Sequence, residues 1–516
     1  MIDNWKRILN LCLVLSSLLI ITSFLFISFS RINYGFDLEW VEGSLLDHVW
    51  RLYDRLPLYI EPSADFITTN YAPLYYYACI ILWKISEPDY WQGRLISIIS
   101  TLIIAFFIFR IVVRERKDWI TGLACAGLFI STYARTGYWF DLIRNDMLTI
   151  AFFIISIYLA LDKQSIRNII LSGIFSALAI LTKQNFIISA FFMALGIIYM
   201  QNLKQALIYV SSLLLFLIPV LLFFHFTSNG WSTYHMFILP AYTPLAYNPI
   251  SFIKLLFFND IGIYSIPIIA IIILIIYLFS MKIISLSKEI VFLIILLAGS
   301  FIQSINNRIH FGSFINQYII VYVLLSLLIG LFAVKLNSTN MKIRLLFSVL
   351  ILFQSICFYA IWDFYVPSAK EKQKVLEFRK KLDTLSKFGN IYMPYHGFLS
   401  RKHSKNTTIH LMTALSHFNT TDKCKTRKQA YISFIDSIQK RKYEVIIWDK
   451  FRNVNIRKIP YEEYLLYTNN YKPVAFFKDP PLLMNKLTLM DVHPFQILIR
   501  RDIPDEKIKE VMNLAK

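Results

Sequence analysis

Long apolar runs separated by short polar turns dominate the first 365 residues of the chain. The first run extends from Ile8 to Phe29, and several later runs approach the ~20 residues that a helix needs to cross a bilayer. The runs show no alternation of apolar and polar positions, which favours helices over an outer-membrane barrel. The pattern predicts a mainly α fold, a polytopic membrane helix bundle of about eleven spans over residues 1–365.

The pattern changes after about residue 365, where the chain becomes polar. We expect a charged amphipathic helix over Ala369–Phe388, ended by Gly389. A second helix and four strands are predicted at Gln429–Lys442 and at Asn390–Tyr395, Tyr443–Trp448, Val474–Phe477 and Gln496–Arg500. Residues 366–516 are therefore predicted to form one small C-terminal α/β domain.

Basic residues between the apolar runs predict the topology. If Pro73–Ser86 crossed the membrane, the basic run Arg110–Lys117 would lie outside, against the positive-inside rule. We therefore expect Pro73–Ser86, short and containing Lys84, to be an interfacial or re-entrant helix. The N-terminus is then cytoplasmic, residues 31–93 form a long first external loop, and the C-terminal domain is extracytoplasmic. Within that loop, one helical face carries the apolar residues Leu45, Leu46, Val49 and Leu52. This spacing predicts an interfacial helix lying along the membrane.

Composition supports a membrane protein and argues against several other classes. Hydrophobic residues make up 56% of the chain, and the net charge is +20. Much of that charge lies in short turns, where it sets topology, so we expect no nucleic-acid partner. The five cysteines show no metal-binding spacing with histidine, and the sequence contains no Walker loop, GxGxxG or HExxH motif.

Ionisable residues gather in four stretches that this topology puts on one external side. A lipid-facing segment has no packing reason to collect so many charges, so they face water, each other or a charged substrate. A carboxylate can take a proton from an attacking hydroxyl, and Lys or Arg can hold a departing phosphate. The candidate site residues are Asp37, Glu42 and His48, then Asp141, Arg144 and Asp146, then Lys183, and finally Arg308 and Asn316.

Structural alternatives exist for several of these charges. Lys183 can end a helix by snorkelling to the interface, and Asp141 and Arg144, three residues apart, can simply steady a helix. On a regular helix Asp141 and Asp146 point ~140° apart, so a shared site needs a bend. We expect solvated loop charges at Glu39, Asp54 and Asp65.

Five motifs together resemble a known family: DLEWVEGSLLDHVWRL, PLYIEPSADFITTNYAPLYYY, TGYWFDLIRNDML, LTKQNF and RIHFGSFINQY. In their order and external placement they resemble the GT-C glycosyltransferases, in particular the bacterial branch related to protein O-mannosyltransferases and lipid A aminoarabinose transferases. The resemblance covers about residues 30–330. It implies transfer of a sugar, with inversion, from a polyprenyl phosphate to a hydroxyl of a glycan, lipid or protein acceptor. It also implies a multi-pass protein of the bacterial inner (plasma) membrane.

The resemblance further implies roles for the candidate residues. A carboxylate of the first loop acts as the base, here Asp37 or Glu42, although Val41 stands where many members have the Asp of an Asp-Glu pair. Asp141 and Asp146 match the second acidic motif, which positions the acceptor or a divalent cation. Asp146 is therefore a third catalytic candidate, and a metal requirement is left open, with Asp37 and Asp146 as its ligands. Substrate binding is expected of Asp141, Arg144, Lys183, His48, Arg308 and Asn316.

Two other functions compete with this hypothesis. A transporter or flippase for a lipid-linked glycan would carry ionisable residues near mid-membrane and paired broken helices. The charges here gather at one external surface instead, which weighs against transport. A polymerase for lipid-linked glycans would differ mainly in its acceptor.

Overall fold

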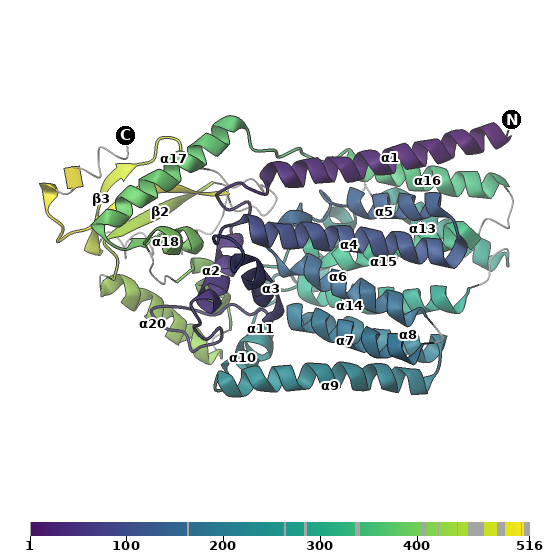
Figure 1. The fold of residues 1–516 in the computed structure, drawn as a ribbon, viewed down its shortest axis with the longest axis horizontal. Helices are drawn as coiled ribbons and strands as arrows, with labels where there is room; N and C mark the ends of the chain where they lie inside the picture. The colour runs from purple at the N-terminus through teal and green to yellow at the C-terminus, as the bar shows by residue number, and fades with distance from the viewer. Residues whose placement is uncertain are drawn as a thin grey trace.

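The computed structural model describes the chain from Ile2 to Lys509, apart from residues 163–164, 263–264, 283–285, 336–340, 405–408, 422, 441, 453–468, 482–490 and 507. A bundle of roughly parallel helices occupies one end of the molecule, and a smaller domain with a sheet occupies the other (Figure 1). The short helices α2 (Glu42–Tyr53) and α3 (Leu74–Trp83) lie between the two parts. The first loop therefore forms the junction of the molecule.

Long apolar helices build the bundle. They are α1 (Ile2–Arg31), α4 (Trp91–Arg116), α5 (Trp119–Ser131), α6 (Asn145–Ala160), α7 (Ile166–Thr182), α8 (Ile187–Met200), α9 (Leu203–Thr227), α13 (Ile266–Ser280), α14 (Lys288–Arg308), α15 (Ile319–Lys335) and α16 (Met341–Tyr359). Short helical turns join α9 to α13: α10 (Trp231–Thr233), η3 (Tyr234–Ile238), α11 (Leu239–Ala241), α12 (Pro249–Lys254) and η4 (Leu255–Ile261).

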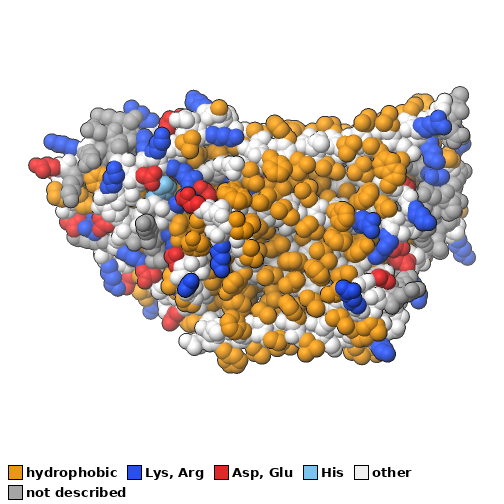
Figure 2. Space-filling view, viewed as in Figure 1, with side chains coloured by type: hydrophobic (Ala, Val, Ile, Leu, Met, Phe, Trp, Pro, Cys, Tyr) orange, Lys and Arg blue, Asp and Glu red, His pale blue; other side chains and the backbone are white. Residues whose placement is uncertain are grey.

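A broad apolar surface covers the face of the bundle seen in Figure 2, and Lys and Arg lie toward its two ends. Among the described residues, six helices are long and apolar enough to cross a membrane, namely α1, α4, α9, α14, α15 and α16. A bent pair, Pro249–Ile261 with Ile266–Ser280, would make a seventh. The predicted multi-pass helix bundle is thus confirmed. The count of about eleven spans stays a prediction, because α5, α6, α7 and α8 are shorter apolar helices.

The first loop differs in one respect from its predicted arrangement. The short helix expected at Pro73–Ser86 is present as α3. The helix at Leu45–Leu52 is also present, but α2 is buried on its polar side as well, including Glu42, Asp47 and His48. The placement of this helix along the membrane stays a prediction, but its polar side does not face open water. The C-terminal helix α18 (Gly397–Ser404) packs on α2 and covers the face that the sequence pattern assigns to water.

The C-terminal domain has the predicted elements. Its helices are α17 (Ala369–Leu385), extended by η8 (Ser386–Phe388), then α18, α19 (Leu411–Phe418) and α20 (Lys425–Gln439). Its strands are β1 (Ile391–Tyr392), β2 (Val445–Arg452), β3 (Tyr471–Phe476) and β4 (Asp491–Arg500), in the order β1-β2-β4-β3. β1 and β2 are parallel, whereas β4 pairs antiparallel with both β2 and β3. The predicted domain boundary at residue 365 falls between α16 and α17 and stays a prediction.

Ion pairs hold the C-terminal domain against the first loop. Arg379 of α17 and Lys402 of α18 both reach Asp89, at 3.0 and 2.9 Å. The loop charges expected to be solvated, Asp54 and Asp65, remain 42% and 64% exposed but pair across the junction with Arg401 and Lys442. Since the domain supplies the cations and the loop the carboxylates, their complementary charges favour this docking.

Candidate functional site

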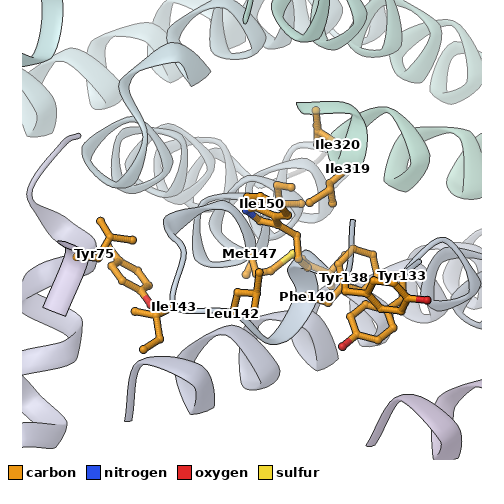
Figure 3. Close-up of a cluster of buried hydrophobic side chains, with 14 of the residues drawn as sticks. Tyr75, Tyr133, Tyr138, Phe140, Leu142, Ile143, Met147, Ile150, Ile319 and Ile320 are labelled. Carbon is orange, nitrogen blue, oxygen red and sulfur yellow. The ribbon is translucent and has the colours of Figure 1, made fainter. Parts of the chain in front are cut away.

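The bend required between Asp141 and Asp146 is present. A 3-10 turn, η1 (Trp139–Asp141), is followed by extended backbone at Leu142 and Arg144, and α6 then begins at Asn145. Apolar side chains of this segment anchor it in a buried cluster, which Figure 3 shows for Phe140, Leu142, Ile143 and Met147. The buried apolar side chains thus hold the backbone of this segment in place. The polar side chains between them can therefore take part in other contacts.

Asp146 lies at the centre of the candidate site. Its Oδ1 accepts hydrogen bonds from Lys183 Nζ at 2.8 Å and from Asn316 Nδ2 at 3.0 Å. Lys183 ends α7, and its ammonium group also donates to Gln317 Oε1 at 3.2 Å. Three of the predicted patches, far apart in sequence, therefore meet at this carboxylate.

Arg144 joins this cluster to the first loop. Its guanidinium lies 3.6 Å from Glu39 Oε2 and 3.9 Å from Asp146 Oδ2. It donates to the Tyr71 hydroxyl at 3.2 Å and lies over the Trp139 ring at 5.1 Å from the centroid. Two carboxylates and two aromatic rings therefore fix the position of this guanidinium.

Glu39 is a site residue that the sequence analysis missed. The expectation of a solvated loop charge is wrong, because Glu39 is only 1% exposed and faces Arg144. Burial raises the pKa of this carboxyl to about 7, although Arg144 opposes the shift. The sequence held one signal for this difference. Glu39 stands three residues before Glu42, so Glu39 precedes the helix and Glu42 lies at its start.

The cluster contains buried polar atoms without a hydrogen-bond partner. These are Glu39 Oε1, Arg144 Nε and Asp146 Oδ2. A buried polar atom left unpaired costs about 1–3 kcal/mol, so several of them together need an explanation. Unpaired acceptors and a donor around one guanidinium are typical of a site that binds a polar ligand.

Glu42, in contrast, has all of its acceptor capacity in use. Arg94 Nη2 donates to Oε2 at 2.7 Å, and both side chains are fully buried. The backbone N–H groups of Leu38 and Ile143 donate to the two carboxylate oxygens at 2.7 and 2.9 Å. Glu42 therefore ties the first loop to α4 and to the second loop, and the geometry gives it a structural role.

Replacing Glu42 with alanine should destabilise the protein by about 3–5 kcal/mol, because Arg94 would remain buried without a counter-ion. The measurement is thermal unfolding of the purified protein in detergent. The matched control is Glu87→Ala in the same loop, where the carboxylate is 84% exposed and a change within about 0.5 kcal/mol is expected. Equal melting temperatures for Glu42→Ala and wild type would contradict the structural role.

Asp37 contacts the C-terminal domain. Its Oδ2 accepts a hydrogen bond from Nδ1 of His396 at 2.5 Å, and neither side chain has exposed surface. Its other oxygen, Oδ1, has no hydrogen-bond partner. Glu42 and Arg94 are close enough to influence its charge. Asp37 thus lies beside the Glu42–Arg94 pair, and its contacts described in the structure do not include Lys183.

Asp141 does not share the site of Asp146. Arg31, at the end of α1, donates to both of its oxygens, through Nε at 2.5 Å and through Nη2. The Tyr133 hydroxyl donates to Oδ1 at 2.7 Å. Because this carboxylate is buried and saturated, it joins α1 to the second loop and has no oxygen left for a substrate.

Two further candidates are also held in structural contacts. His48 has Nδ1 at 2.7 Å from the carbonyl of Ser44, while Nε2 accepts from the N–H of Thr69 at 2.8 Å. Burial lowers the pKa of His48 to about 3, so the ring is neutral. Arg308 pairs with Asp260 at 3.0 Å and donates to the carbonyl of Ser313. Neither residue contacts the Arg144–Lys183 cluster directly in the contacts described.

The donor set around the two proposed metal ligands does not fit a shared divalent cation. Asp37 pairs with His396, whereas Asp146 pairs with Lys183 and lies near Arg144. The two carboxylates thus pair with different partners, and one oxygen of each is already in a hydrogen bond. Within the described ranges, no group of three or more His, Cys, Asp or Glu could hold a metal ion. The requirement for a divalent cation stays a prediction.

A cavity of about 790 Å³ opens beside the site, between the end of α2, α3 and α9. Its walls are largely apolar, and its lining includes Tyr59, Tyr77, Phe223, Phe224, Thr227, Arg55 and Lys84. Arg144 and Lys183 do not line it. The Tyr59 hydroxyl donates to the carbonyl of Tyr71, whose own hydroxyl contacts Arg144. The cavity and the polar cluster are therefore neighbours separated by two tyrosines.

Comparison with known proteins agrees with this architecture. The family model of dolichyl-phosphate-mannose-protein mannosyltransferases matches residues 70–224. The fold is similar to ArnT from Cupriavidus metallidurans, solved bound to undecaprenyl phosphate and in the apo state, with TM-scores of 0.59 and identities of 11% and 12%. Both alignments cover 92% of this chain and 97% of ArnT. AglB from Archaeoglobus fulgidus, an archaeal oligosaccharyltransferase, gives a TM-score of 0.46 at 11% identity, covering 86% of this chain and 70% of AglB. No curated protein sequence matches the chain.

The fold and the family match define the class of protein. The chain is a multi-pass membrane protein whose fold is similar to that of ArnT, and its residues 70–224 match the mannosyltransferase family model. The resemblance to the GT-C superfamily indicated by the sequence motifs is thereby confirmed. The match to the family model lies on the segment that contains α3, the second loop and Lys183, which is where the polar cluster forms.

Proposed function

We propose that this protein transfers a sugar from a polyprenyl-phosphate donor to a hydroxyl acceptor, on the extracytoplasmic face of a bacterial plasma membrane. The observation that supports it is the cluster of Arg144, Asp146 and Lys183, buried at the end of a GT-C bundle beside an apolar cavity. ArnT, which has a similar fold, was solved with undecaprenyl phosphate bound, and this supports the same class of donor.

Arg144 and Lys183 hold the donor phosphate in this proposal. The acceptor oxygen attacks the anomeric carbon, the bond from that carbon to the phosphate oxygen breaks, and the electron pair leaves with the phosphate. Negative charge grows on the phosphate in the transition state, where a fixed guanidinium and ammonium stabilise it. Asp146 orients Lys183 through the 2.8 Å hydrogen bond, and Asn316 orients Asp146 in turn.

Asp37 takes the proton of the acceptor hydroxyl. Glu42 is saturated by Arg94 and backbone N–H groups, so it has no free oxygen for this role. Glu39 is ion-paired with Arg144, so we assign the base role to Asp37, whose Oδ1 has no hydrogen-bond partner. Attack from the side opposite the phosphate inverts the anomeric centre. Since Asp37 is fully buried, the acceptor reaches its unpartnered Oδ1 through a local movement of the first loop, while Oδ2 keeps its hydrogen bond to His396.

The cavity between α3 and α9 holds the isoprenoid chain next to the phosphate. Its aromatic and aliphatic walls suit an apolar chain, and Tyr71 links it to Arg144. Arg55 and Lys84 line the same cavity and would remain near the head-group level.

Replacing Thr227 with tryptophan should fill the cavity and weaken binding of undecaprenyl phosphate about tenfold, through lost apolar contact. Binding of a short-chain polyprenyl phosphate should change little, because its phosphate contacts are kept. The matched control is Phe226→Trp, since Phe226 is exposed on the same helix but does not line the cavity. Affinities of both variants are compared by titration in detergent; equal weakening by the two variants would contradict this role of the cavity.

The proposal is tested by incubating the purified protein in lipid nanodiscs with labelled undecaprenyl-phosphate sugars. Consumption of one donor with release of undecaprenyl phosphate and formation of a glycoside is expected. Movement of intact donor between leaflets of sealed vesicles, without cleavage, would instead support a flippase. Extension of the product to long chains would identify the polymerase.

A further inference from the structure

The C-terminal domain reaches Asp37 through a single histidine. His396 lies in the turn between β1 and α18, and its Nδ1 donates to Asp37 Oδ2 at 2.5 Å. On the other side of the ring, Nε2 lies 3.2 Å from Asp449 Oδ1. None of the three side chains has exposed surface. A carboxylate, an imidazole and a second carboxylate thus form one buried row across the domain junction.

We propose that His396 and Asp449 are positioning residues of the transferase site, through which the C-terminal domain orients Asp37 and favours its ionised form. The inference rests on the proposed role of Asp37 as the base. It gives the C-terminal domain a part in the reaction beyond covering the first loop.

Local structure holds the two residues in this geometry. The pairing of β2 with β4 shifts register between Trp448 and Asp449, and a β-bulge of this kind re-aims a side chain. The Phe36 ring lies against the imidazole, with centroids 4.5 Å apart. The histidine is therefore packed on one face and flanked by a carboxylate at each nitrogen, which leaves its ring little freedom to rotate.

Charge favours the same arrangement. Burial works against a charged His396, but Asp449 and Asp37 outweigh it and raise the pKa of His396 to about 9. The imidazolium donates from Nδ1 to Asp37, and its charge is also paired with Asp449, 3.2 Å from Nε2. Burial raises the pKa of Asp37, and the hydrogen bond and charge of His396 oppose that rise. Without His396 the base would therefore hold its proton to a higher pH.

Other titratable groups surround the row. From the first loop and α4, Glu42 and Arg94 act on Asp37 with opposite signs, and Tyr90 lies close to it. From the C-terminal domain, His410 lies near His396, and burial keeps the pKa of His410 at about 3. Because Glu42 and Arg94 act with opposite signs and His410 is neutral, His396 is the main neighbour that opposes the rise in the pKa of Asp37 caused by burial.

The test is the pH profile of kcat/KM for transfer by the full-length protein in nanodiscs, using the labelled undecaprenyl-phosphate sugar that wild type consumes. His396→Gln should move the acidic limb of the profile upward by about one pH unit, equal to a roughly tenfold loss of rate on that limb. Asp449→Asn, which leaves His396 in place, should move it in the same direction by less. The matched control is His403→Gln on α18, whose partner Asp383 lies within the C-terminal domain.

The outcomes separate the inference from the proposed function. An unshifted acidic limb in both His396→Gln and Asp449→Asn, with Asp37→Asn inactive, would overturn the inference and leave the function standing. A shift in His403→Gln as large as that in His396→Gln would also overturn it, because a general loosening of the domain would then explain both. A wild-type protein that cleaves no polyprenyl-phosphate donor would refute the proposed function itself.

Discussion

Replacing Asp37 with asparagine should abolish sugar transfer while the protein still folds and inserts into the membrane. Asparagine keeps the size of the side chain and its hydrogen bond to His396, but it cannot accept the proton of the acceptor hydroxyl. A positioned general base contributes about 10²–10⁴-fold to a rate, and a loss in that range is expected. Initial rates with the labelled donor measure it, and thermal unfolding checks that the variant is folded.

A matched control distinguishes loss of the base from loss of charge in the first loop. Asp65→Asn removes a carboxylate of the same loop that is 64% exposed, and its transfer rate should equal that of wild type. The decisive comparison is with Glu39→Gln, which removes the negative charge beside Arg144 and keeps the size of the side chain. Full activity of Asp37→Asn together with complete loss in Glu39→Gln would move the base role from Asp37 to Glu39.

Removing the ammonium group of Lys183 should weaken the binding of undecaprenyl phosphate. Lys183→Met keeps the length of the side chain but leaves Asp146 buried with Arg144 3.9 Å away, so the single variant should also lose about 3–5 kcal/mol of stability. The double variant Asp146→Asn with Lys183→Met removes both charges and should recover most of that stability. It should still bind undecaprenyl phosphate about 10–100-fold more weakly than wild type, since a charge-assisted hydrogen bond contributes about 1.5–3 kcal/mol.

Binding of undecaprenyl phosphate by titration, and thermal unfolding of the same samples, measure the two effects separately. Lys204→Met is the control, because Lys204 is an exposed lysine at the start of α9. If the double variant binds undecaprenyl phosphate as tightly as wild type, the phosphate role of Lys183 is wrong, and the lysine only neutralises Asp146.

The carboxylates of the predicted motifs show what a sequence pattern can find. Asp141 and Asp146 lie in one motif, yet Asp141 is bound by Arg31 of α1 and Asp146 by Lys183 of α7. Both are buried charges paired with a cation, and only their partners reveal which one belongs to the candidate site. The same holds for Glu42, where the partner is Arg94. A motif marks where charges gather, and long-range packing decides which of them have oxygens left for a substrate.

The sequence alone determined that this is a membrane helix bundle with a small α/β domain after it, and it located the strands and α17 closely. Those properties follow from local physics. A run of apolar residues must leave water, basic turns stay on one side of a bilayer, and strand and helix periodicities are readable within about ten residues.

Only the tertiary structure decided which charges are buried and what they touch. Glu39 becomes a buried partner of Arg144, and Asp37 meets a histidine 359 positions further along the chain. These contacts are absent from any local window, because they form when the C-terminal domain docks on the first loop and excludes water from both surfaces. Burial and pairing then set the charge state of each carboxylate, and with it the role that each can have in the reaction.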